Sequence, residues 1–434
     1  MNDLEKLIQE LCPDGVEYKE LKSVFEMRNG YTPSKAKAEF WEGGTIPWFR
    51  MEDIRENGNI LSDSAQHITP AAVKGKLFPA NSIIVATSAT IGEHALITVE
   101  SLANQRFTYL VRRPEYEEKL DPKFVYYYCY KLDEWCLNNT NISSFPSVDM
   151  AKFAKFKIAI PPLPVQREIV RILDNFTELT AELTAELTAR KKQYGYYRDS
   201  LLTFGMHKEG KWSNIGDVAT VTKLAGFEFT KYVTYSGKGK IIALRGLNVK
   251  NGKLDLSDVK YIDNSDLSKL TRSKLKKGDM LFTYVGTIGQ VALIDENDKY
   301  YLAPNVALIR CNEEVLIPEY MRYYFQSGQF WKTQIKRLLQ SSSMQNIPME
   351  KIRKFQIYIP SLEIQSRIVN VLDNFDAICS DLNIGLPAEI EARKKQYEYY
   401  RDMLLTFAAA DDIILTDRQT DRQTDRQTDR QTDR

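Results

Sequence analysis

The residues with the types most often used in catalysis lie in one short segment near the start of the chain. Asp14, Glu17 and Lys19 fall within PDGVEYK. Two carboxylates and a lysine are a set with which a nuclease could hold a metal ion at a phosphate. Nucleases usually take these acids from separate strands, whereas here they are close neighbours in the sequence. We therefore expect no nuclease site in this segment.

Other catalytic motifs are missing from the sequence. It contains no Gly-rich dinucleotide fingerprint, no GxxxxGK[ST], and no Asn- or Asp-Pro-Pro-aromatic segment of the kind that amino-methyltransferases use; Pro161-Pro162 lacks both flanks. The five cysteines are scattered without a CxxC, and there are three histidines. This pattern supports neither a disulfide framework nor a zinc site. We predict a chain with no catalytic residues, no metal and no cofactor of its own.

Composition indicates a globular protein with several cores. The chain has 434 residues, of which 43% are hydrophobic and 27% charged. No apolar run approaches the roughly 20 residues of a membrane span, and the acidic start MNDLEKLIQELCPDG is not typical of a signal peptide. We expect a cytoplasmic protein with no membrane partner.

Charge is distributed unevenly between the two halves. The formal net charge is only +1, yet residues 236–277 hold eleven Lys or Arg against four Asp. The matching stretch, residues 35–76, holds six charges of each sign. The basic stretch is either a solvated face or a binding surface.

The elements that would position any site are duplicated. IPPLPVQREIVRILDNF (160–176) and ARKKQYGYYRDSLLTF (189–204) return about 199 residues later as IPSLEIQSRIVNVLDNF (359–375) and ARKKQYEYYRDMLLTF (392–407). Apolar residues at steps of three and four predict a helix of about 40 residues, roughly 60 Å long, in the first copy. Gly385-Leu386-Pro387 should break or kink the second. The two apolar stripes favour antiparallel pairing, although such a pair could also serve only to complete a core.

A tandem repeat lies inside the first helix. TAEL occurs as Thr180 to Leu183 and again as Thr184 to Leu187. Each unit adds about 6 Å and roughly 400° of rotation, so the apolar face turns by only some 40°. The repeat is therefore either an adjustable spacer or a neutral product of slippage.

The segments between the helices indicate an α/β (α+β) fold in two domains. SIIVAT and MLFTYV are typical of buried strands, each followed by a tight TIG turn, and DPKFVYYYCYKLDEW and IPEYMRYYFQSGQFW of helices. We predict a pseudo-two-fold duplication with domains at 1–158 and 206–357, long helices at 159–205 and 358–408 that pair as an antiparallel coiled coil, and a tail at 409–434. The framework is shared while its side chains differ.

These features together resemble one protein family. The domain and helix order, the LDNF and ARKKQYxYYRDxLLTF segments, the opening CPDGVEYKEL and the tandem TAEL are similar to the specificity subunits of type I restriction-modification systems, in the IC-like branch. The resemblance implies a non-catalytic subunit that reads a bipartite sequence in double-stranded DNA, one half per target recognition domain. It also implies docking to two modification (methyltransferase) subunits and to restriction (translocase and nuclease) subunits, which would use S-adenosylmethionine, ATP and Mg. The alternatives are a free-standing duplicated DNA-binding regulator and a scaffold without a DNA role.

Polar residues near the expected loop tips and strand ends are the candidates for base contacts. In the first domain they are Arg50, Ser88, Thr90, Gln105, Arg106 and Ser144; in the second they are Arg245, Tyr284, Thr287, Asn305, Ser343, Gln345 and Asn346. The candidates for phosphate contacts are Lys152, Lys155, Lys351, Arg353 and Lys354. For each of these residues, ordinary surface or turn chemistry is the competing interpretation.

The end of the chain is a second repeat. From Thr416 it has TDRQ four times and then TDR, with alternating charge and no apolar face, so we expect disorder. The only tetranucleotide that encodes this series is ACAG. The tail is therefore either a slippage tract that causes phase variation or a harmless extension.

Overall fold

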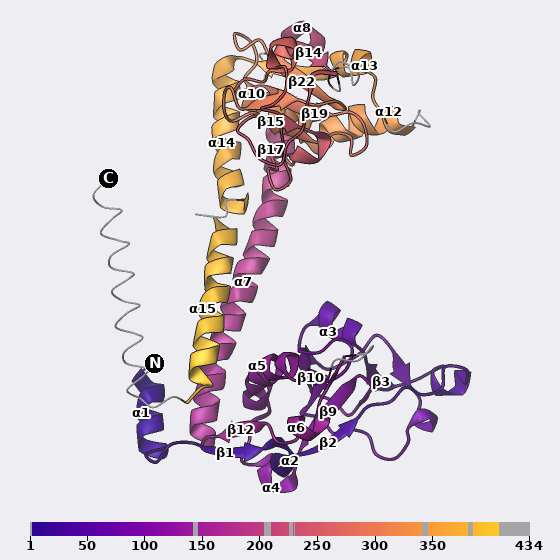
Figure 1. The fold of residues 1–434 in the computed structure, drawn as a ribbon, viewed down its shortest axis with the longest axis vertical. Helices are drawn as coiled ribbons and strands as arrows, with labels where there is room; N and C mark the ends of the chain where they lie inside the picture. Colours follow the sequence, from indigo (N-terminus) through magenta and orange to yellow (C-terminus); the bar gives the residue numbers. More distant parts are fainter. Residues whose placement is uncertain are drawn as a thin grey trace. The chain divides into compact units, whose positions relative to one another are not determined.

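The protein is described from a computed structural model (Figure 1), which covers residues 2–141, 146–203, 210–224, 229, 231–340, 346–380 and 385–407. The chain divides into two compact units. Unit 1 is Met1–Glu182 with Glu391–Arg434, and unit 2 is Leu183–Ile390. The long helix α7 (Leu163–Leu201) thus contributes its first half to unit 1 and its second half to unit 2.

Unit 1 is built on a mainly antiparallel five-stranded sheet. Its order is β2 (Phe25–Asn29), β9 (Phe107–Arg112), β6 (Ser82–Ala86), β7 (His94–Ile97) and β4 (Ile60–Leu61). All five residues of β6 are buried, because the apolar run SIIVA lies in the middle of the sheet. Helix α5 (Pro122–Asn138) packs on β6 and β7. The strand and helix predicted for these two segments are confirmed.

Smaller elements complete unit 1. A second sheet has the order β5 (His67–Ile68), β3 (Ile46–Phe49) and β8 (Leu102–Ala103), in which β3 and β8 run parallel. Two short pairs are β1 (Glu17–Glu20) with β12 (Lys157–Ile160), and β10 (Thr140–Asn141) with β11 (Ser147–Val148). The other α-helices of the domain are α1 (Asn2–Leu11), α2 (Leu21–Val24), α3 (Met51–Asn57), α4 (Pro114–Glu117) and α6 (Met150–Phe153).

Unit 2 repeats this plan. Its larger sheet has the order β14 (Ala219–Lys223), β22 (Val306–Cys311), β19 (Met280–Thr283) and β20 (Val291–Leu293). A second sheet has β18 (Lys260–Tyr261), β15 (Ile242–Leu244) and β21 (Tyr300–Leu302), again with its last two strands parallel. The short pairs are β13 (Gly210–Asn214) with β23 (Gln356–Pro360), and β16 (Val249–Lys250) with β17 (Lys253–Leu254); α8 (Ile215–Val218) and α13 (Met349–Arg353) correspond to α2 and α6. The predicted α/β class and duplicated domain are confirmed.

The helix that follows β22 differs from its counterpart α5. It stops after α10 (Pro318–Phe325) and resumes as α11 (Gly328–Phe330), a π-helix η6 (Trp331–Ile335) and α12 (Lys336–Gln340). The Ser327 hydroxyl accepts a hydrogen bond from the Phe330 N–H at 3.1 Å and so caps a new helix start. The prediction of one helix through Trp331 is therefore wrong in unit 2.

Each unit contains a pair of long helices that come from different copies of the repeat. In unit 1, Phe176 of α7 stacks on Tyr400 of α15 (Leu386–Leu404), with ring centroids 5.5 Å apart. In unit 2, Tyr197 of α7 stacks on Phe375 of α14 (Leu362–Ser380) at 5.4 Å. These are the same two positions of the repeat, with the copies exchanged. Residues 381–384, which lie between α14 and α15 in the sequence, are outside the described ranges.

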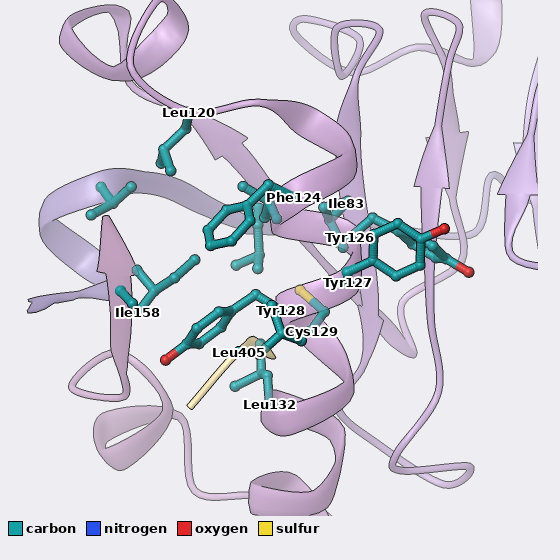
Figure 2. Close-up of a cluster of buried hydrophobic side chains, with 14 of the residues drawn as sticks. Ile83, Leu120, Phe124, Tyr126, Tyr127, Tyr128, Cys129, Leu132, Ile158 and Leu405 are labelled. Carbon is teal, nitrogen blue, oxygen red and sulfur yellow. The ribbon is translucent and has the colours of Figure 1, made fainter. Parts of the chain in front are cut away.

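The leucines at the ends of these helices are part of the two cores. Leu405, just after α15, is fully buried in the core of unit 1, and Figure 2 shows it beside Tyr128, Cys129 and Leu132 of α5. Its counterpart Leu202, just after α7, is buried in the core of unit 2. Each core is thus completed by the helix end of the other copy.

A duplicated glutamine anchors the start of α7 and of α14. Gln166 is fully buried; its Oε1 accepts from the Asp121 N–H at 2.8 Å, and its Nε2 donates to the carbonyls of Lys119 and Pro161 at 2.8 and 2.7 Å. Gln365 makes the same three bonds, with the Ile317 N–H and the carbonyls of Val315 and Pro360, all at 2.9 Å. The helices are therefore fixed to the two domains in the same way.

A tyrosine and aspartate pair is repeated about two helical turns after each glutamine. Tyr127 donates to Asp174 Oδ1 at 2.7 Å in unit 1, and Tyr323 donates to Asp373 Oδ1 at 2.5 Å in unit 2. Burial, and then the hydrogen bond to the carboxylate, raise the pKa of both tyrosines, so both remain neutral donors. The aspartates are those of the two LDNF segments.

Candidate nucleic-acid interface

Backbone hydrogen bonds gather most of the predicted contact residues of unit 1 at one edge. The Asn104 N–H donates to the Phe49 carbonyl at 3.0 Å, which places the turn after β8 beside the end of β3. The Thr87 N–H donates to the Arg106 carbonyl at 3.0 Å, and Ser88 forms a bridge with Ser147. We define edge 1 as Arg50, Ser88 to Thr90, Gln105, Arg106 and Ser147.

Backbone hydrogen bonds also form an equivalent edge in unit 2, where the bond from Ile347 corresponds to that from the Val148 N–H to the Thr87 carbonyl, at 2.9 Å, in unit 1. The Ala303 N–H donates to the Leu244 carbonyl at 3.0 Å, and the Ile347 N–H donates to the Tyr284 carbonyl at 2.9 Å. Val285 forms a bridge with Asn346, as Ser88 does with Ser147. We define edge 2 as Arg245, Tyr284 to Thr287, Asn305 and Asn346. The remaining predicted contacts, Ser144, Ser343 and Gln345, lie outside the described residues.

An arginine occupies the same place in both edges, directly after the middle strand of the small sheet. The Arg50 N–H donates to Asp53 Oδ2 at 2.7 Å, and the Arg245 N–H donates to Asn248 Oδ1 at 3.0 Å. In both, a side chain three residues later closes the turn over the arginine backbone. An arginine side chain has no acceptor, so the acidic or amide partner alone forms this cap.

The two guanidinium groups differ in their own contacts. Within the described residues that of Arg50 makes no hydrogen bond, and the nearest carboxylate oxygen, on Glu52, is 4.0 Å from its Nε. Arg245 Nη2 donates to the carbonyl and the Oδ1 of Asp258, at 2.8 and 3.1 Å. Both Nε atoms are buried without a partner among the described residues. A buried donor without an acceptor is costly, so each arginine is left with bonding capacity for a ligand.

The TIG turns of the two edges are held against the helices by their glycines. Gly92 and Gly289 have φ of +90° and +87°. A Cβ there would also lie 2.8 Å from the Leu137 side chain or 2.6 Å from the Trp331 ring. Only glycine meets both conditions. The residue after each glycine fixes the turn by a hydrogen bond. Glu93 Oε1 accepts from Arg55 Nη2, and Gln290 Oε1 accepts from the Asn251 N–H, both at 3.0 Å.

The remaining edge residues differ in exposure and pairing. Gln105 is exposed, and its Oε1 accepts from the Thr32 hydroxyl at 2.5 Å. Arg106, Thr287 and Asn305 are exposed, whereas Thr90 is half-buried and its hydroxyl has no partner among the described residues. Burial raises the pKa of Tyr284, so it stays neutral beside Asn305.

The predicted phosphate contacts lie on the short helices α6 and α13 or just after them. Lys152 forms an ion pair with Asp149, with 3.7 Å between Nζ and Oδ2. Exposed lysines without an ion pair within the described ranges are Lys155, Lys351 and Lys354. Arg353 is different, because its Nη2 donates to the Val221 carbonyl at 3.1 Å inside the domain.

The TAEL segment is regular helix. Leu183 and Leu187 are half-buried, and Thr184 is exposed. The Thr180 hydroxyl donates to the Phe176 carbonyl at 2.8 Å, and the Thr188 hydroxyl to the Thr184 carbonyl at 2.9 Å. These threonine hydroxyls therefore have hydrogen-bond partners within their own helix.

The anchoring residues Gln166, Asp174, Gln365 and Asp373 do not appear among the sequence candidates, although they lie in the repeated segments. The apolar seam of the helix does not include them. A signal was present: both glutamines precede a matching Ile and Val in PVQREIV and EIQSRIV.

Comparisons with known proteins agree with this architecture. The family model described as the type I restriction modification DNA specificity domain matches residues 13–190 and again 208–392. The chain belongs to this family. It is 40% identical over 396 residues to the type I restriction enzyme EcoprrI specificity subunit of Escherichia coli, covering 87% of this chain and 91% of that one. It is 32% identical over 310 residues to the EcoR124I/EcoR124II specificity subunit of the same species, covering 67% and 72%.

The fold is also shared with solved structures of type I systems. A chain from a study of complex assembly and conformational transition in the type I R-M system aligns with a TM-score of 0.64 at 15% identity, covering 92% of this chain and 98% of that one. The family resemblance predicted from the repeated segments is confirmed by the family model and by the relatives. No helix in the described part of this family member is long and apolar enough to span a membrane.

Proposed function

We propose that this chain is the DNA-specificity subunit of a type I restriction-modification complex and that each unit reads one half of a bipartite target. The observation that carries the proposal is the pair of edges, which share a backbone pattern and differ in side chains. Sequence is read by side chains at base edges, so one framework with two sets of side chains suits two half-sites.

The proposal assigns no chemical step to this chain. Methylation would belong to two modification subunits with S-adenosylmethionine, and translocation and cleavage to restriction subunits with ATP and Mg. The specificity subunits among the relatives support this division of labour. The complex would act in the cytoplasm, on the DNA of the host and of invaders.

The test is to express the chain with a modification subunit of its own operon and to sequence the methylated positions of the host DNA. We expect one methylated motif of two fixed halves around an unspecified gap. Replacing unit 2 residues 210–357 with those of another family member should change one half of the motif only. A contiguous motif, or a change in both halves, would contradict the proposal.

The TAEL repeat would set the gap between the half-sites. One repeat adds about 6 Å of helix, compared with about 3.4 Å for a base-pair step. Variants with one and three repeats should shift the gap by one or two base pairs and keep both half-sites. As a control, inserting only Ala-Glu turns the following helix by about 200° and should abolish methylation. An unchanged gap in the repeat variants would rule out the spacer.

The TDRQ tail lies outside the described residues, and we propose for it a role in switching the reading frame. Gain or loss of one four-nucleotide unit would change the sequence that follows. Sequencing the locus across isolates is the test: a variable ACAG tract supports the idea, and a fixed tract of another sequence ends it.

A further inference from the structure

Unit 2 contains a hollow of about 450 Å³ whose lining is basic. Arg337 of α12 and Lys351 and Lys354 at α13 face it, together with Trp212 of β13. Among the described residues, no carboxylate lines it. Because none of the three cations forms an ion pair within the described ranges, their charge is available to a ligand.

The walls of the hollow are fixed by hydrogen bonds between backbone and side chain. Gln334 lies in the π-helix η6, and its Nε2 donates to the Gln356 carbonyl while its Oε1 accepts from the Gln356 N–H, both at 2.7 Å. These two hydrogen bonds hold η6 and α12 against β23. The π-helix is absent from the corresponding helix α5, so the wall is particular to unit 2.

The hollow lies next to edge 2 along the chain. Asn346 of edge 2 bridges Val285, and α13 begins three residues later at Met349. Trp212 is 47% exposed, and its ring meets Tyr358 edge-on at 5.8 Å. An exposed indole beside cations is suited to pack on the sugar or base of a nucleic acid strand whose phosphates the cations bind.

We infer that this basic hollow binds the phosphodiester backbone of DNA next to the half-site read by unit 2. The inference rests on the proposed function, which it extends from the reading of bases to the positioning of the duplex. Arg337, Lys351 and Lys354 each neutralise phosphate charge, and none of them selects a base.

The test uses the full chain in complex with its modification subunits and a duplex carrying the methylated motif. The variant Arg337→Gln, Lys351→Gln, Lys354→Gln should bind every duplex more weakly and keep the same motif. Its dependence of log K on log salt should be shallower by about two to three, close to one per phosphate contact. Lys336→Gln is the control, since Lys336 is exposed on the same helix α12 and does not line the hollow.

Neutral methylphosphonate groups placed singly along the duplex locate the contact. In the wild type, one or a few positions beside the second half-site should weaken binding, and the triple variant should be insensitive at the same positions. A changed motif, an unchanged salt slope, or loss of the modification subunits instead of DNA affinity would overturn the inference. If the wild-type complex shows no sequence preference, the proposed function is wrong. If the wild type has a sequence preference and the triple variant has the same affinity and salt dependence as the wild type, only the inference about the hollow is wrong.

Discussion

The anchors and the edges of the two units differ in what the duplication preserved. The anchors use the same residues in both copies, namely Gln166 and Gln365 with Asp174 and Asp373, and they make the same bonds. The edges keep the backbone pattern and one arginine, Arg50 or Arg245, while most other side chains differ, with Gln105 and Arg106 in one edge and Asn305 in the other. Burial explains the difference for the glutamines, because a buried polar group must keep its partners, whereas an exposed side chain can change without loss of stability.

The largest expected effect comes from removing an anchor. Gln166→Ala leaves an N–H and two carbonyls without their partner in the interior, which should cost about 3 kcal/mol or more. Gln365→Ala should have the same effect on unit 2. Hydrogen exchange measured by mass spectrometry on the full chain assigns the loss to a unit. Asn175→Ala and Asn374→Ala, exposed on the same helices, are the controls and should change little. If only one of the two glutamines matters, the anchors are not equivalent.

The next effect tests the exchange of helix ends between the copies. Leu405→Ala should destabilise unit 1, and Leu202→Ala unit 2, each by about 2 to 5 kcal/mol, because both leave cavities in well-packed cores. Hydrogen exchange should show faster opening of α5 in the first variant and of α10 in the second. The exposed Leu11→Ala and Leu256→Ala should be nearly neutral. Faster hydrogen exchange in unit 2 for Leu405→Ala, or in unit 1 for Leu202→Ala, would show that the helix ends do not complete the core of the other copy.

Much of the fold was predictable, because the two copies of the repeat can be compared with each other. Long helices and buried strands such as SIIVA depend on local apolar patterns, and these were found. The break at Ser327 was not, since a single serine decides between a continued helix and a new cap. The π-helix that forms the wall of the basic hollow depends on Gln334 binding residue 356, a contact that no local pattern contains.

The edges show the same limit for the candidate site. The sequence predicts Arg50 and Arg245 as contacts because they are polar residues near expected loop tips or strand ends, and the structure places them at equivalent positions. That their Nε atoms are buried without a partner among the described residues could not be foreseen, because burial of one atom depends on the packing of several distant segments. The anchoring glutamines occur at matching positions of the two repeat copies, but because they are polar, the apolar pattern of the helices does not include them.

A moderate effect should separate the two arginines. We expect Arg50→Ala to lose discrimination at one base pair of the half-site read by unit 1, by about 1 to 3 kcal/mol. Arg245→Ala should cost less in its own half-site, because Asp258 already occupies part of its guanidinium. Competition binding of single-base-pair variants of the motif by the complex measures both. Arg171→Ala, an exposed residue of α7 paired with Glu168, is the control. Equal weakening on all sequences would assign Arg50 to phosphate instead.

The smallest effect concerns the repeat that only one copy carries. Because the hydroxyls of Thr180 and Thr188 bind carbonyls of their own helix, Thr180→Ala and Thr188→Ala should change stability by less than about 0.5 kcal/mol. Alanine is also the better helix former, which offsets the lost hydrogen bond. The methylated motif should keep its gap, since helix length and not threonine chemistry would set the spacing. A shifted gap in either variant would mean that the hydroxyls contact another element, and the repeat would then be a specific joint between parts of the chain instead of a spacer of adjustable length.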